Sequence, residues 1–206
     1  MQAVKRRLHT SVDVLIQISE NYYLMSEKLS QDDISGHRSL AITRSAVGLE
    51  TISRIYRLTD RQPDAETFPR MKGYLQDPDL LDRLFDEYNY DGRKTRSEFH
   101  DYVVETIQFI DDICSSDEVK RVRIFRQRYT GHLIPNPREL EKFGPTADVH
   151  QFTSAEIRRI TDGLSEVVSH LFYLHDRTTY PYADIARLAR DDALQLWNQI
   201  RARKQA

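Results

Sequence analysis

The sequence lacks the features of a disulfide-stabilised, zinc-binding or membrane-spanning protein. It holds a single cysteine, Cys114, among 206 residues, which excludes an internal disulfide and a zinc ribbon. Beside Ile113, this cysteine is interpreted as a small apolar core residue. No segment approaches the roughly 18 apolar residues of a membrane span, and the basic stretch from Met1 to Arg7 is not followed by the apolar run of a signal peptide. We therefore expect a cytoplasmic protein without membrane contact.

The chain also has few glycines and prolines and a small net charge. Only 7 Gly and 7 Pro are present, and most prolines stand near expected helix ends, which favours an all-helical chain. The net charge is −2, from 30 basic and 32 acidic residues, so any binding to nucleic acid must come from a local patch. The chain has no Gly-rich phosphate loop, no His-Glu-x-x-His motif and no Cys/His cluster. We expect no metal and no cofactor.

Apolar residues recur at heptad-like spacing in the first part of the chain. A first helix of about 25–30 residues carries Leu8, Leu15, Tyr22 and Leu29, and a second, from about 37 to 59, carries Ile42, Leu49 and Tyr56. Both stripes are interpreted as core, with some of that surface available to a second subunit. Two such helices joined by a short turn predict an antiparallel pair.

Turn and capping signals divide the remainder into further helices. We predict helices at about 78–88 and 95–115, and a third that begins at Ser116-Asp117 and stops at Pro135. A further helix begins at the capping box Thr153–Glu156 and runs to about 174, and the last covers 182–203. A short helical piece is also possible at 138–143. The expected fold is a single all-α domain over residues 1–206. It is an antiparallel bundle of about six to eight helices, with the helix at 182–203 packed on it.

Positive charge is concentrated on one predicted helix end. Six of the nine residues from 120 to 128 are basic or amide-bearing, and His132 follows. By composition alone, such a run is most often a solvated helix face. An arginine can nevertheless neutralise a phosphate, and a histidine can move a proton near neutral pH. Arg126 and His132 point roughly 120° apart on an ideal helix, but Gly131 and Pro135 favour a turn there, and a second copy could complete a site.

At these residues the sequence resembles the HEPN superfamily, and within it the abortive-infection proteins of the U type. That superfamily carries an arginine, then a polar residue, then a histidine after four to six intervening positions. Here Arg126 and His132 have five residues between them, with Gln127 in the polar position. The segment from Arg57 to Asp60 and the pair Tyr22-Tyr23 are similar to the ends of the family's first two helices. The resemblance covers about residues 10–180.

The resemblance implies a helical bundle that dimerises and a metal-independent endoribonuclease that leaves a cyclic phosphate and a 5′-hydroxyl. His132 would act as general acid or base, Arg126 would stabilise charge on the phosphate, and Gln127 would orient substrate or histidine. The remaining cations of the segment would hold the RNA backbone: Lys120, Arg121, Arg123 and Arg128. The implied partners are RNA, a second copy of the chain, and an antitoxin or other defence-system protein.

Two alternatives stay open. The same basic end could belong to a non-catalytic helical module that binds RNA or a partner protein, as some superfamily members do. It could also be a plain structural helix end.

Overall fold

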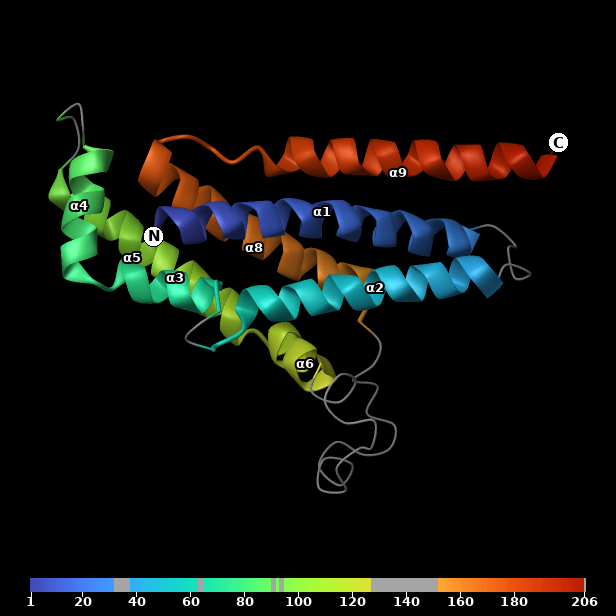
Figure 1. Ribbon diagram of the computed structural model, residues 1–206, viewed down its shortest axis with the longest axis horizontal. Coiled ribbons are helices and arrows are strands. Elements are labelled where there is room, and N and C mark those ends of the chain that lie inside the picture. Colours follow the sequence, from blue (N-terminus) through green and yellow to red (C-terminus); the bar gives the residue numbers. More distant parts are fainter. Residues whose placement is uncertain (32–37, 63–64, 90–91, 93–94, 127–151, 206) are drawn as a thin grey trace, which may run out of the picture.

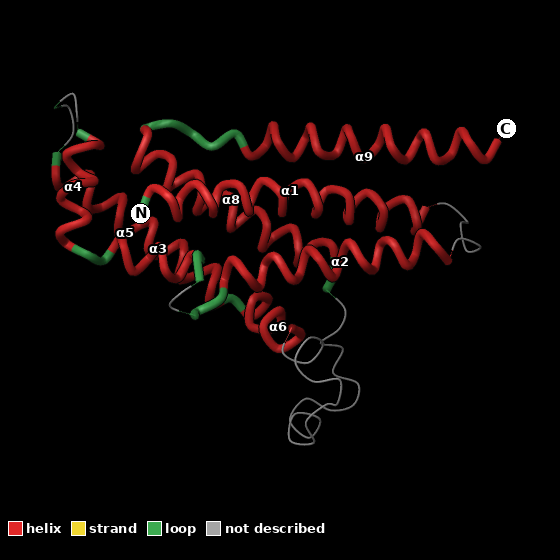
Figure 2. The backbone as a smooth tube through the Cα atoms, in the orientation of Figure 1, coloured by secondary structure: helices red, strands yellow, loops and turns green. Residues whose placement is uncertain are grey.

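The computed structural model describes residues 1–31, 38–62, 65–89, 92, 95–126 and 152–205, and within these ranges helices are the only regular secondary structure (Figures 1 and 2). The helices are α1 (Gln2–Gln31), α2 (Arg38–Thr59), α3 (Phe68–Leu75), α4 (Pro78–Tyr88), α5 (Arg96–Ser115), α6 (Asp117–Arg126), α8 (Ser154–Asp176) and α9 (Tyr182–Gln205). The prediction of an all-α helical bundle is confirmed.

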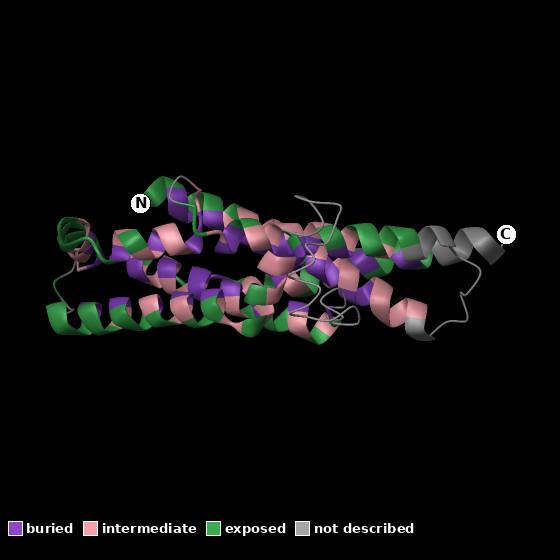
Figure 3. Cartoon of the chain, turned by 90° about the horizontal axis from the view of Figure 1, so that it is seen from below, coloured by how far each residue is buried: buried purple, intermediate pink, exposed green. Residues whose placement is uncertain are grey.

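Helix α1 lies at the centre of the bundle. Helices α2, α8 and α9 all pack along it, and α2 runs antiparallel to it, as predicted (Figure 1). Helix α5 packs on α8, and α6 packs on α2 near the end of that helix. Buried residues face one another between these helices, while exposed residues cover the outer faces (Figure 3).

The inner face of α1 follows the spacing of an amphipathic helix. Val4, Leu8, Val12 and Leu15 are at most 5% exposed, and their spacings of four and three residues keep them on one side. The predicted core stripe is therefore confirmed at Leu8 and Leu15. It weakens toward the end of the helix, where Tyr22 is only half-buried.

The predicted core stripe of α2 is wrong at two of its three positions. Ile42 is 60% exposed and Leu49 is 46% exposed, while Tyr56 is half-buried and packs against the core. The inner face instead consists of Thr51, Ile52, Ile55, Leu58 and Thr59. Both sets have helical spacing, and the positions of α1 and α6 decide which one is covered.

Several helix starts are set by local hydrogen bonds, and the capping box at Thr153 was predicted from the sequence. The Asp77 carboxylate caps α4 ahead of Pro78. Thr95 begins α5 with a capping box to Glu98, and Thr153 begins α8 with the same arrangement. Helix α3 was not predicted, because Pro69 reads as a break in the sequence. In the structure this proline occupies the first turn of a helix capped by Thr67, where a missing N–H costs nothing.

Two further expectations have definite outcomes. Cys114 is 5% exposed, and burial raises the pKa of its thiol to about 11, which confirms it as a core residue. The last predicted helix is α9, whose Trp197 and Ala193 pack with Leu24 of α1. The expected continuation of α6 to Pro135 and the short helical piece at 138–143 lie outside the described residues.

No helix in the described part of the chain is both long and apolar enough to cross a membrane.

Candidate functional site

Arg126 is the last described residue of α6, and its side chain is exposed. Its guanidinium carbon lies 4.6 Å from the centroid of the Tyr56 ring on α2. A guanidinium over a tyrosine ring is held electrostatically by the negative face of the ring. Tyr56 directly precedes the segment from Arg57 to Asp60. The two segments that carry the family resemblance are therefore in contact, although about 70 residues separate them in the sequence.

Arg123 connects α6 to the ends of α2 and α5. Its Nη2 donates hydrogen bonds of 2.9 Å to the carbonyls of Thr59 and Cys114. These carbonyls lie at the ends of α2 and α5, where helices leave backbone acceptors without an intrahelical partner. Burial, together with the nearby Arg61, lowers the pKa of the Arg123 guanidinium. In the structure the Nη2 of Arg123 donates inside the protein and positions α6, while its Nε is buried without a hydrogen-bond partner among the described residues. The RNA contact expected of Arg123 stays a prediction.

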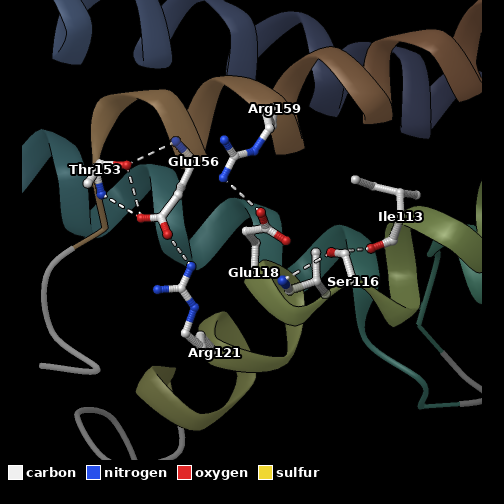
Figure 4. A network of polar contacts seen from close by, with 8 residues as sticks. Ile113, Ser116, Glu118, Arg121, Thr153, Glu156 and Arg159 are labelled. Atoms are coloured by element: carbon white, nitrogen blue, oxygen red, sulfur yellow. Dashed lines mark hydrogen bonds and ion pairs between the residues drawn. The ribbon is translucent and has the colours of Figure 1, made fainter. Parts of the chain in front are cut away.

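Arg121 joins α6 to the start of α8 (Figure 4). Its guanidinium pairs with the Glu156 carboxylate and lies 5.5 Å from the Phe152 ring centroid. A second ion pair, between Glu118 and Arg159 at 2.9 Å, connects the same two helices. Like Arg123, Arg121 was predicted as an RNA contact, and its observed contacts hold two helices together.

Lys120 differs from the other two cations. Its side chain is exposed, and its ammonium lies 2.8 Å from the Asp117 carboxylate of the same helix. A pair between exposed groups three residues apart is worth little in water. Lys120 is therefore the cation of this group that can exchange its partner for a phosphate at small cost.

Phe125 and Phe152, which flank the segment 127–151 in the sequence, are in aromatic contact. Their ring centroids are 5.9 Å apart in an edge-to-face arrangement. Gln127, Arg128 and His132 lie outside the described residues. His132 is six residues from Arg126, so the length of the chain keeps their Cα atoms within about 21 Å of each other.

Tyr56 is the site residue that sequence reasoning missed. Its heptad position predicted core packing, which is confirmed, and its ring also supports the motif arginine. The signal was its place directly before Arg57 in the segment that resembles the family. The neighbouring cations Arg54 and Arg57 both pair with Glu50, at 2.7 and 3.2 Å.

Metal ligands are not gathered in the described part of the chain, where no three His, Cys, Asp or Glu side chains could hold an ion together. His170 lies on α8, five residues before His175. Its ring stacks on Tyr102, with centroids 4.8 Å apart and an interplanar angle of 16°. The expectation of no cofactor is untested by these contacts.

The fold and the position of Arg126 define an all-α bundle that presents a motif arginine at an exposed helix end. The chain matches the family described as AbiU2, HEPN_AbiU2, over residues 1–196. It belongs to the HEPN superfamily, in the branch of the U-type abortive-infection proteins, and this membership associates it with abortive infection. No curated protein and no solved structure matches the chain.

Proposed function

We propose that this protein is a metal-independent endoribonuclease of the HEPN type, a defence or toxin effector that cuts RNA in a cleft shared by two copies of the chain. The observation that carries the proposal is the place of Arg126. The family match covers nearly the whole chain, and the motif arginine stands at an exposed helix end on the Tyr56 ring. Phe125 and Phe152, which lie on either side of the segment with His132, are in aromatic contact beside Arg126.

The chemistry follows from these residue types. The ribose 2′-oxygen attacks the phosphorus, the bond from phosphorus to the 5′-oxygen breaks, and the products are a 2′,3′-cyclic phosphate and a 5′-hydroxyl. One proton leaves the 2′-hydroxyl and one reaches the 5′-oxygen. His132 transfers protons, and Arg126 donates hydrogen bonds to the phosphoryl oxygens as their charge rises.

The proposed dimer follows from the number of protons. The reaction needs a base and an acid at one phosphate, and each chain supplies one histidine in the motif. Two copies of the motif across a two-fold axis bring two histidines and two arginines to one cleft. Gln127 orients the substrate or the histidine, and the exposed cation Lys120 holds the strand together with Arg128.

The decisive experiment compares wild type with Arg126→Ala and His132→Ala on a labelled single-stranded RNA in EDTA. Arg187→Ala is the matched control, because Arg187 is an exposed arginine on α9 that pairs with Asp184 of its own helix. We expect cleavage by wild type and by the control, and at least 100-fold slower cleavage by the two motif variants, the order of loss for a removed charge-stabilising or proton-transferring group. Equal cleavage by all four proteins would sink the proposal.

The ends of the products give a second readout. Cyclic phosphate on the 5′ fragment is expected, and 3′-hydroxyl ends would contradict the mechanism. Sedimentation of the same samples reports whether the active form is a dimer.

One observation favours a non-catalytic RNA- or protein-binding module as the second candidate. Arg121 and Arg123 are both engaged in contacts within the protein, which leaves fewer cations for a bound strand. That module binds RNA with an affinity that falls steeply as salt rises, and it yields no products in EDTA or in Mg²⁺.

A further inference from the structure

A groove of about 620 Å³ opens beside the residue that precedes Arg126. It lies between α1, α2, α6 and the start of α8, and Phe125 forms part of its wall. Its volume is within the range of roughly 300–1,000 Å³ that is typical of small-ligand sites. None of the interactions described for the proposed reaction uses it.

Aromatic rings form the apolar part of the groove. The buried residues Phe125 and Phe152 line it, together with the half-buried Tyr22 of α1. Gly48 of α2 lies against this ring, because a Cβ added there would meet a ring carbon of Tyr22 at 2.9 Å. The glycine therefore lets the Tyr22 ring lie close to α2.

The polar part of the groove suits an anion. Arg44 lines it and has no carboxylate partner in the described part of the chain. Thr153 and Ser154 line it as well, at the start of the 23-residue helix α8. The Glu156 carboxylate already caps this helix start and pairs with Arg121, so Arg44 supplies the positive charge of the groove. None of the described lining residues is acidic. The Ser26 hydroxyl is buried without a hydrogen-bond partner among the described residues.

The other large groove has the opposite character. It measures about 400 Å³, lies between α5, α8 and the start of α9, and is lined by Asp162 and Glu166 beside tyrosine rings. Two carboxylates repel a phosphate. Of the two grooves, only the one beside Arg126 combines aromatic rings with an arginine.

We infer that the groove beside Arg126 binds one nucleotide of single-stranded RNA, next to the phosphate that Arg126 contacts. The base lies against Tyr22, and its phosphate faces Arg44, beside Thr153 and Ser154. Base stacking on an aromatic ring is tolerant of sequence and contributes strongly to the affinity for single strands. This inference rests on the proposed function and names the part of the strand that the site holds.

The test uses a strand that cannot be cut. A fluorescent 2′-O-methyl RNA hexamer lacks the attacking hydroxyl, so its binding, followed by anisotropy, is independent of cleavage. We expect Tyr22→Ala and Arg44→Ala to raise the Kd about 10-fold or more, since loss of one stacked base costs roughly this much. Tyr22→Phe keeps the ring, and Arg187→Ala removes a distant arginine, so both stay within about twofold of wild type.

Photocrosslinking of wild type to a strand that carries 5-bromouracil gives a readout free of folding effects. Crosslinks to Tyr22, Phe125 or Phe152 support the inference. Crosslinks confined to other residues, no binding by wild type, or wild-type affinity in both Tyr22→Ala and Arg44→Ala overturn it. Occupation of the groove by another part of the chain or by a second copy appears as one of these outcomes.

The outcomes separate this inference from the proposed function. If unmodified RNA is cleaved by wild type while Tyr22→Ala and Arg44→Ala bind the hexamer normally, the groove inference fails alone. If both variants lose binding but wild type cleaves nothing, the groove inference stands and the ribonuclease proposal fails.

Discussion

The guanidinium of Arg126 lies over the ring of Tyr56, with 4.6 Å between the arginine Cζ and the ring centroid. This contact joins the end of α6 to the last turn of α2. It fixes the direction of an otherwise long and flexible side chain, and a preoriented arginine loses less freedom when it meets a phosphate.

The Tyr56 ring should therefore influence cleavage through Arg126, without contacting the reacting atoms of the RNA. We expect Tyr56→Ala to lower kcat about 2- to 5-fold, because an exposed cation–π contact is worth about 0.5–1 kcal/mol. Tyr56→Phe keeps the ring face and should cleave at nearly the wild-type rate. Single-turnover cleavage by the three proteins measures the effect. If Tyr56→Phe loses as much as Tyr56→Ala, the hydroxyl and not the ring is the important group.

Arg123 should matter for stability. Arg123→Met removes the donor to the carbonyls of Thr59 and Cys114, and a hydrogen bond to a charged group is worth about 1.5–3 kcal/mol. We expect a loss of about 2 kcal/mol in the free energy of unfolding, since the site is only partly buried. Urea denaturation measures it. Lys120→Met, at an exposed position of the same helix, should change stability by less than about 0.5 kcal/mol, and equal losses would show that Arg123 has no special role.

Local signals explain which parts of the fold could be predicted. Each of the capping boxes at Thr95 and Thr153 involves only four consecutive residues, so the starts of α5 and α8 could be predicted from the sequence. The spacing of Ile42 and Leu49 was equally clear, yet both are exposed. Periodicity shows that a helix has an apolar face, but only the positions of α1 and α6 decide which face of α2 is buried.

The same distinction applies to the candidate site. The family motif identified Arg126 from sequence, because a motif is a local pattern. The partner of Arg121 is 35 residues away, and Arg123 donates to carbonyls 64 and 9 residues away, so the sequence does not indicate that these two arginines join helices. The RNA contacts that the family resemblance implies for both arginines stay a prediction.

The pair of Arg121 with Glu156 should hold α6 against α8 in a pH-dependent way. Burial opposes the charge of this carboxylate, but hydrogen bonds from Arg121 and Thr153 outweigh it and lower the pKa of Glu156 below its usual 4.5. Because the folded protein binds this proton less readily, the stabilisation is complete above the unfolded pKa and is lost as the pH falls through the folded value. Urea denaturation should show Glu156→Gln well below wild type at pH 7.

The difference in stability between these two proteins should shrink as the pH falls below about 4.5, the usual value of the carboxyl. Glu118→Gln is the comparison, because its partner Arg159 is more exposed, with a side chain 64% accessible against 36% for Arg121. We expect a smaller loss at pH 7 in this variant. A loss for Glu156→Gln that does not change with pH would show that the ion pair contributes nothing.

His170 should make the bundle sensitive to mild acid. Its ring is packed between Tyr102 and Phe109, with centroids 4.8 and 4.6 Å away, and burial lowers its pKa below 6.5 although Glu105 and Glu166 oppose this. The unfolded chain therefore binds the proton more readily than the folded one. Stability is highest above pH 6.5 and declines as the pH falls through the unfolded value toward the folded one.

The replacement His170→Gln removes this titration while keeping a polar side chain of similar length near the Thr106 hydroxyl, which lies 3.4 Å from Nδ1. We expect wild type to lose more of its unfolding free energy between pH 7.5 and pH 5 than His170→Gln does, as measured by urea denaturation at each pH. His100→Gln changes an exposed histidine on the same helix as Tyr102 and should follow wild type. Parallel losses in wild type and His170→Gln would mean that the buried ring accepts its proton without cost, and that the acid sensitivity arises elsewhere in the bundle.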